Sequence, residues 1–147
     1  MQCCNTTTPT LPLSVYRTND CFKMYVSDAG VLTAMMRFEA KRTIVENTIK
    51  GFAKGGLYEN AIMQQLVARG YDPFYYQKSS SVGEIDFLVE RNGAVVPIEV
   101  KAGRTSSTSF DRLLEQKDVV VGYKFINGNV GKAGKKITLP HYMTMFL

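Results

Sequence analysis

Two apolar runs that alternate with polar residues stand on either side of Asn92-Gly93, in the stretch GEIDFLVERNGAVVPIEVKAG over residues 83–103. Alternation with a period of two residues is typical of β-strands, whose side chains point to opposite faces in turn. The Asn-Gly pair favours a two-residue type I′ turn, because both central positions of that turn need a positive φ angle. We therefore predict a β-hairpin in which Arg91 pairs with Ala94 and the pairing continues outward from there.

This register places charged residues opposite one another on one face of the hairpin. Asp86 then faces Glu99, and Glu84 faces Lys101. The other face is expected to be all core, with Ile85, Phe87, Val89, Val96, Ile98 and Val100. Two like charges directly opposite each other destabilise a sheet, so Asp86 and Glu99 need a cation beside them. Lys101 is one candidate for that cation and a bound metal ion is another.

The pattern elsewhere predicts an α/β (or α+β) domain with a mixed central sheet flanked by helices. Helical spacing of apolar residues is clearest in LYENAIMQQLVARG, where Gly70 is expected to end the helix. Asp28 is a candidate cap for an earlier helix. Helical segments are expected to include VLTAMM and to cover 37–54, 57–70 and 108–117. Strands are expected over 22–28, 74–78, 119–126 and 137–147, with a loop over 127–136.

The first residues are polar and rich in Thr and Pro, and we expect 1–15 to be a flexible N-terminal extension. The domain is then expected to cover 16–147. Its core, from about residue 56, follows the order helix, strand, strand, strand, helix, strand.

Composition excludes several classes of site. The chain has 147 residues and three cysteines, an odd count that fits no zinc spacing or disulfide framework. His141 is the only histidine, so a histidine-based metal site or a Ser-His-Asp triad is not expected. The segment GNVGKAGKK lacks the spacing of a phosphate-binding loop. The net charge of +5 permits contact with nucleic acid without indicating it.

No apolar run has the length of a membrane span, and the first residues lack the pattern of a signal peptide. We therefore expect a cytoplasmic protein with no membrane partner.

A helix with a glutamate, a three-strand meander and then Asp…Glu-x-Lys resembles the PD-(D/E)xK nuclease superfamily. Here the residues are Glu59, Asp86, Glu99 and Lys101. Carboxylates on neighbouring strands suit Mg²⁺ or Mn²⁺, which prefer oxygen ligands, so Asp86 and Glu99 are the expected metal ligands. Such an ion lowers the pKa of a bound water, and Lys101 can orient that water or stabilise developing charge. Lys101 is expected to add little to stability, because ion pairs on a polar sheet face contribute little.

The resemblance extends to a narrower family. The stretches KMYVSDAGVLTAMM, KGGLYENAIMQQLVARG, GEIDFLVERNGAVVPIEVKAG and ITLPHYM resemble, in this order, domain of unknown function 4143. That domain lies at the C-terminus of prokaryotic AAA-type ATP-binding proteins. The resemblance implies a restriction-endonuclease-like fold and an AAA-type ATPase domain as partner. This chain carries no ATPase motif, so ATP binding is not carried over.

Two functions remain open from the sequence. The first is a Mg²⁺- or Mn²⁺-dependent phosphodiesterase that acts on DNA or RNA, with Asp86, Glu99, Lys101 and Glu59 as site residues. The second is a catalytically silent recognition or regulatory module with a nuclease-like fold. Glu59 is equally well explained by the preference for acidic residues in the first turn of a helix. Glu84 is best explained by an ordinary ion pair with Lys101.

Overall fold

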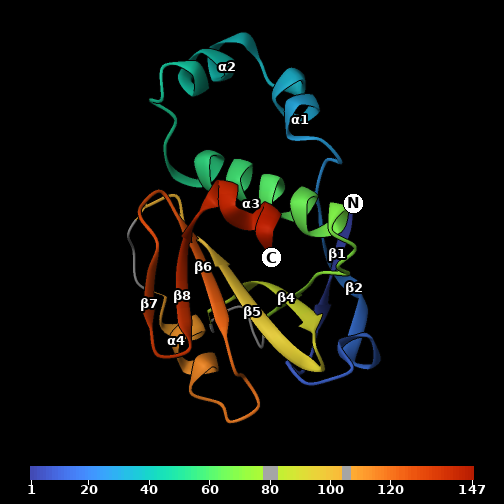
Figure 1. The fold of residues 1–147 in the computed structure, drawn as a ribbon. Helices are drawn as coiled ribbons and strands as arrows, with labels where there is room; N and C mark the ends of the chain where they lie inside the picture. Colours follow the sequence, from blue (N-terminus) through green and yellow to red (C-terminus); the bar gives the residue numbers. More distant parts are fainter. Residues whose placement is uncertain (78–82, 104–106) are drawn as a thin grey trace.

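The computed structural model describes residues 1–77, 83–103 and 107–147, apart from the side chain at position 52. In this part of the chain, helices flank both faces of an eight-stranded mixed sheet, as the α/β prediction required (Figure 1). The strand order is β2-β1-β3-β4-β5-β6-β8-β7. The strands are β1 (Gln2–Thr6), β2 (Arg17–Met24), β3 (Phe74–Tyr76), β4 (Ile85–Arg91), β5 (Ala94–Val100), β6 (Gly122–Ile126), β7 (Gly131–Ala133) and β8 (Lys136–Pro140).

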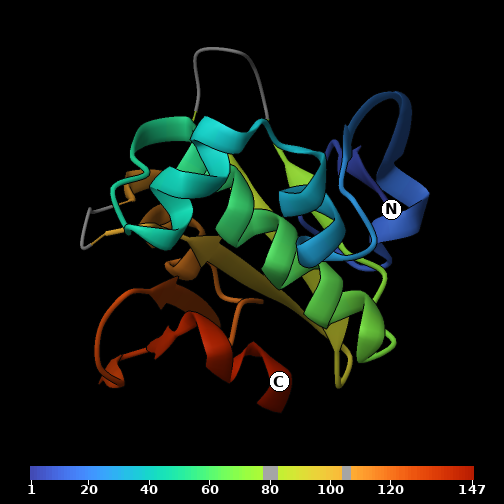
Figure 2. The ribbon, with the colours of Figure 1, turned by 90° about the horizontal axis from the view of Figure 1, so that it is seen from above.

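The α-helices are α1 (Ala29–Met35), α2 (Phe38–Val45), α3 (Gly51–Ala68) and α4 (Thr108–Leu114), and the 3-10 helices are η1 (Leu13–Tyr16) and η2 (His141–Phe146). The side chain of Asp28 caps α1 by accepting the Val31 N–H, as predicted. Gly70 follows α3 with a φ of 85°, the left-handed conformation in which helices commonly end. Seen from above, α1 and α2 lie over α3 (Figure 2).

The central hairpin has the predicted register. Arg91 pairs with Ala94, and the ladder continues to Phe87 opposite Ile98. Asn92 and Gly93 have φ angles of 51° and 72°, as a type I′ turn requires.

Each face of the hairpin is buried under a different helix. Ile62, Met63 and Leu66 of α3 pack on the face that carries Phe87 and Ile98. Phe110, Leu113 and Leu114 of α4 pack on the other face, against Leu88 and Val95. The face that carries the predicted charged residues is therefore an internal layer between the sheet and α4.

The predicted flexible N-terminal extension is wrong in its first residues. Residues 2–6 form β1, an internal strand that pairs with β2 and, in parallel, with β3. Cys3 is fully buried and Cys4 nearly so. They pack into the cores on the two faces of the sheet, and this burial stabilises the strand although polar threonines follow it. All three cysteines are unpaired.

Other boundaries also differ from prediction. The strand expected over 22–28 lies over Arg17–Met24, and the segment 37–54 breaks into α2 and the start of α3. The predicted loop 127–136 contains β7, which forms a hairpin with β8 around Gly134. The last strand ends at Pro140 and η2 follows. For the strand expected over 74–78, residue 78 lies outside the described residues.

His141 is the first residue of η2 and was expected in a strand. Its ring stacks on that of Tyr58 in α3, with centroids 4.0 Å apart and planes inclined by 11°. Its Nε2 lies 3.1 Å from the backbone oxygen of Lys101. His141 thus ties the C-terminal segment to α3 and to the end of β5.

Candidate functional site

A bulge in β4 sets the position of Asp86. Phe74 of β3 pairs with Leu88, and Tyr76 pairs with Ile85. Two residues of β4, Asp86 and Phe87, therefore oppose one residue of β3, which is the arrangement of a β-bulge. The bulge turns Ile85 into the layer under α4, so the prediction that Ile85 shares a face with Phe87 is wrong.

The carboxylate of Asp86 is buried between two strands. Its Oδ2 accepts the backbone N–H of Val100 at 2.7 Å, and the residue is only 6% exposed. Burial first, and then the charges of Glu99 and Glu59, raise the pKa of Asp86 to about 7, although Lys101 and the Val100 N–H oppose the rise. The pKa of Asp86 is therefore raised mainly because its charged form is poorly solvated, and the neighbouring acidic side chains add to the rise.

Glu99 is the most deeply buried charged residue among those described, at 1% exposure. Its Oε1 lies 2.5 Å from Nζ of Lys101. Its Oε2 is buried and has no hydrogen-bond partner among the described residues. A buried carboxylate oxygen without a partner is costly, and it marks a place where a donor or a cation would stabilise the protein.

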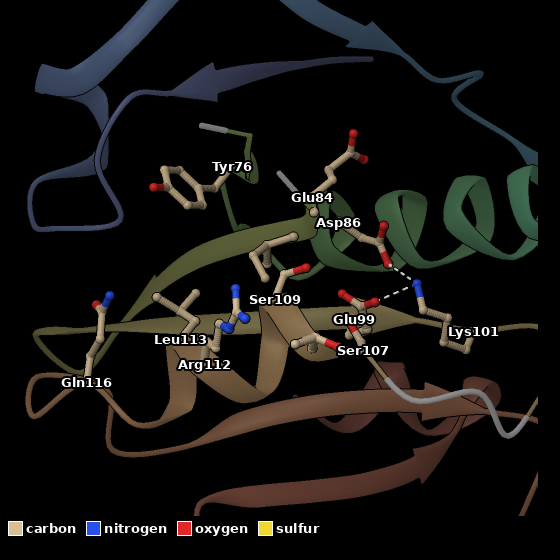
Figure 3. Close-up of a pocket in the computed structure, with 13 residues that line it drawn as sticks. Tyr76, Glu84, Asp86, Glu99, Lys101, Ser107, Ser109, Arg112, Leu113 and Gln116 are labelled. Carbon is tan, nitrogen blue, oxygen red and sulfur yellow. Dashed lines mark ion pairs between the residues drawn. The ribbon is translucent and has the colours of Figure 1, made fainter. Parts of the chain in front are cut away.

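Lys101 joins the two carboxylates. Besides its contact with Glu99, its Nζ lies 4.0 Å from Oδ2 of Asp86 (Figure 3). Burial acts to lower the pKa of Lys101, but the contact with Glu99 and the charge of Asp86 outweigh it, so the pKa is raised. Lys101 is therefore a charged ammonium that only partly balances two carboxylates.

These three side chains line one wall of a cavity of about 590 Å³ between the hairpin and α4. Figure 3 shows Asp86, Glu99 and Lys101 grouped at one end, with Arg112 and Leu113 of α4 and Gln116, which follows α4, farther along. The volume lies within the range of small-molecule sites. The predicted proximity of Asp86, Glu99 and Lys101 is thus present in the structure.

The candidate Glu59 and a second glutamate, Glu84, both contact a lysine from the N-terminal part of the chain. Lys23 of β2 forms an ion pair with Glu84 and lies 3.7 Å from Oε2 of Glu59. Glu59 also accepts from the hydroxyl of Tyr25 at 3.3 Å. The predicted pairing of Glu84 with Lys101 is therefore wrong, because the bulge changes the direction of the strand before Asp86. Glu59 influences Asp86 through its charge but is not one of the residues that line the cavity.

Sequence reasoning missed three cations near the site. Lys23 carries no sequence signal, because β2 lies far from the hairpin along the chain. Lys124 is the register partner of Glu99 on β6, and a lysine inside an apolar strand was a usable signal. Burial, followed by the charge of Lys136, lowers the pKa of Lys124. Arg112 lines the cavity from α4 and could have been found from its helical spacing with Ser109 and Gln116.

The cavity offers some, but not all, of the oxygen ligands that a hard divalent cation needs. Asp86 and Glu99 supply carboxylate oxygens, the ligands such ions prefer, and the orphaned Oε2 of Glu99 is an available donor. Within the described residues, no group of three or more Asp, Glu, His or Cys side chains is placed to hold a metal. The two carboxylates would therefore bind an ion that keeps several of its waters, which is the habit of Mg²⁺.

Comparison with known proteins gives a family match and two relatives. The chain matches the family described as "Domain of unknown function" (DUF4143) over residues 54–140, a range that contains Asp86, Glu99 and Lys101. Uncharacterized proteins of Mycobacterium bovis and Mycobacterium tuberculosis are each 29% identical over 91 residues. The aligned region is 61% of this chain and 19% of each relative, so it spans about a fifth of their length. No solved structure matches the chain.

None of the helices in the described part of the chain has the length and apolar character that crossing a bilayer requires.

Proposed function

The chain belongs to the family described as domain of unknown function 4143, and on this premise and the site geometry we propose that it is a metal-dependent nuclease-like domain acting on nucleic acid. The observation that carries the proposal is the buried pair Asp86–Glu99, which faces a cavity of about 590 Å³ with Lys101 between the two carboxylates. This Asp…Glu-x-Lys arrangement on adjacent strands resembles the PD-(D/E)xK nucleases.

Charge balance supports a metal ion at this pair. Two acidic groups in a buried layer face one ammonium, and burial first, then the charges of Glu99 and Glu59, raise the pKa of Asp86. A purely structural cluster would be expected to satisfy its buried oxygens, yet Oε2 of Glu99 lacks a partner among the described residues. A Mg²⁺ or Mn²⁺ ion held by Asp86 and Glu99 would supply the missing positive charge.

When bound, such an ion supplies an acidified water and stabilises charge on a phosphate oxygen. The residues of the chain prepare the site for it. The Val100 N–H fixes the carboxylate of Asp86, and Glu99 is shielded from bulk water at 1% exposure. Lys101, with its ammonium between the carboxylates and its side chain 30% exposed, can reach a phosphate oxygen in the cavity and stabilise charge that develops there.

The alternative is a silent recognition or regulatory module, and one observation favours it. Lys101 forms ion pairs with Asp86 and Glu99. Lys23 forms ion pairs with Glu84 and Glu59. A lysine in place of a metal ion is what a site that has lost its activity would retain. The resemblance to the C-terminal domains of AAA-type proteins gives this module a partner, which we propose to be an AAA-type ATPase domain.

A cleavage assay separates the two functions. Wild type, Asp86→Asn and Lys101→Met are incubated with single-stranded, duplex and branched DNA and with RNA, in Mg²⁺, Mn²⁺ or EDTA. Lys117→Met is the matched control, because Lys117 is exposed and lies outside the cavity. Circular dichroism first confirms that each variant is folded.

We expect wild type and Lys117→Met to cut in metal and not in EDTA. Asp86→Asn should be inactive, and Lys101→Met should lose about 10²–10³ in rate, the usual effect of removing one charge-stabilising donor. A wild type that binds metal and cuts none of the substrates would favour the silent module. Equal cutting by wild type and Lys101→Met would place the activity elsewhere.

A further inference from the structure

The cations that line the cavity have different surroundings. Lys101 is committed to Glu99 and Asp86. Arg112 lines the same cavity from α4, and no ion pair with an acidic residue is present for it among the described residues. Arginine stays protonated at all relevant pH values, so the cavity contains a permanent positive charge that the carboxylates do not neutralise.

The packing of α4 fixes where this charge lies. Phe110 and Leu113 are buried against the hairpin, which sets the rotation of the helix. The preceding residue, Asp111, is drawn to the side of β8, where its Oδ1 lies 2.8 Å from Nζ of Lys136. The acidic neighbour of Arg112 is thus engaged on another side, and Figure 3 shows the guanidinium pointing into the cavity.

Polar side chains accompany Arg112 along the same wall. Ser109 and Gln116 also line the cavity. Ser109 lies three residues before Arg112, on the same side of α4, and Gln116 lies in the turn that follows α4. A guanidinium offers a planar fork of donors that matches phosphate oxygens, and a hydroxyl and an amide can complete such a contact. The carboxylates lie at the other end of the cavity (Figure 3).

We propose that Arg112, with Ser109 and Gln116 beside it, binds a second phosphate of the strand whose scissile phosphodiester lies at the Asp86–Glu99 pair. This inference rests on the proposed function. It names the substrate class as an oligonucleotide with at least one phosphate flanking the scissile one. It also assigns the two cations separate tasks, because Lys101 serves the reacting phosphate and Arg112 holds the chain beside it.

Binding without cleavage tests the inference. Fluorescein-labelled oligonucleotides of DNA and RNA are titrated with protein in EDTA at several salt concentrations, and fluorescence anisotropy gives Kd. The variants are Arg112→Gln, Arg112→Lys and the control Arg42→Gln, whose guanidinium pairs with Glu46 on the surface of α2. Arg112 is exposed, so its variants are expected to fold, and thermal melts check this.

We expect Arg112→Gln to weaken binding by about tenfold or more, as for a charge-assisted hydrogen bond. The slope of log K against log salt should fall by about one. Arg112→Lys should recover the salt slope and only part of the affinity, because lysine keeps the charge without the planar fork. Arg42→Gln should leave both quantities near the wild-type values.

A neutral methylphosphonate placed at one linkage at a time identifies the contacted phosphate. For wild type, one position should weaken binding by about the same factor as Arg112→Gln, and in Arg112→Gln that position should have no further effect. If no position shows this coupling, or if Arg112→Gln binds like wild type, the inference is overturned. Undetectable binding by wild type also overturns it.

The two proposals fail separately. If the salt dependence of binding depends on Arg112 but the protein never cuts with metal, the phosphate subsite is supported and the nuclease activity is refuted. Metal-dependent cutting with identical KM in wild type and Arg112→Gln would keep the activity and refute the subsite. If both proposals hold, Arg112→Gln should raise KM more than it lowers kcat.

Discussion

The side-chain Oδ2 of Asp86 accepts the backbone N–H of Val100 at 2.7 Å. In a regular antiparallel pair a backbone carbonyl of β4 would accept a hydrogen bond from β5. At the bulge the Asp86 carboxylate, in place of a backbone carbonyl, accepts this hydrogen bond. Asp86 therefore links β4 to β5 and is also one of the two acidic groups of the cavity. A substitution that keeps an acceptor oxygen therefore separates the structural role of Asp86 from its charge.

Asp86→Asn should flatten the dependence of stability on pH. The folded protein holds the pKa of Asp86 at about 7 against an ordinary 3.8, chiefly through burial. The folded state therefore binds this proton more tightly than the unfolded state does. The resulting stability is complete below about pH 4 and is lost as pH rises through 7, by a free energy of unfolding on the order of 2–4 kcal/mol.

Urea denaturation in metal-free buffer from pH 5 to 8 measures this effect as the difference between wild type and Asp86→Asn. Comparison with the variant is needed because His141 changes stability with pH in the opposite direction. Burial lowers the pKa of His141, so its contribution to stability is lost as pH falls. At pH 8 the variant should be the more stable protein, because it lacks the buried charge of Asp86. Its amide oxygen can still accept the Val100 N–H. Parallel pH profiles for the two proteins would refute this assignment.

Lys101→Met should destabilise the metal-free protein by about 1–3 kcal/mol. The sequence predicted a small effect, because ion pairs on a polar sheet face contribute little. In the structure Glu99 is 1% exposed and Lys101 is its partner at 2.5 Å, and removing one member of a buried pair leaves an uncompensated charge. Partial exposure of Lys101 reduces the effect below that of a fully buried pair.

The matched control for this prediction is Lys136→Met. Lys136 contacts Asp111 at 2.8 Å, but the Asp111 side chain is 46% exposed, and such pairs contribute about 1 kcal/mol or less. Chemical denaturation of both variants gives the comparison. Saturating Mn²⁺ should stabilise Lys101→Met at least as much as wild type, because a competing cation has been removed. An equal loss of stability in the two metal-free variants would show that Glu99 does not depend on Lys101.

Two glycine substitutions test the hairpin that brings Asp86 and Glu99 together. Gly93 has a φ of 72° in the turn, so Gly93→Ala should cost about 1 kcal/mol of stability. Gly56 lies inside α3 with nothing near the position of an added methyl group, so Gly56→Ala should stabilise by about 0.5–1 kcal/mol. Thermal melts of the two variants measure both effects. A change in stability of the same sign for Gly93→Ala and Gly56→Ala would contradict the turn assignment.

The sequence predicted the hairpin because its signals are local. Asn92 and Gly93 determine the turn, and the turn determines the pairing from Arg91–Ala94 to Phe87–Ile98. The proximity of Asp86, Glu99 and Lys101 follows from that register. The site was therefore predictable as far as it depends on adjacent strands joined by a short turn.

The rest of the site depends on contacts between distant parts of the chain. The bulge at Asp86 arises in the pairing of β4 with β3, and no local pattern marks it. Lys23 reaches Glu84 only because β1 and β2 join the sheet beside β3. The polar N-terminal segment gave no sign of this, since the burial of β1 depends on the strands around it.

The most direct test of the account is a metal titration followed by thermal melting. Wild type, Asp86→Asn and the control Asp20→Asn, at an exposed position of β2, are titrated with Mn²⁺ and Mg²⁺. At about a hundredfold excess over Kd, binding to the folded state alone stabilises by about 2.7 kcal/mol, which is roughly 5–10 °C in Tm for a domain of this size. We predict this rise for wild type and for Asp20→Asn, and no rise for Asp86→Asn. An equal rise in all three proteins, or none in wild type, would contradict the claim that Asp86 and Glu99 hold a divalent cation.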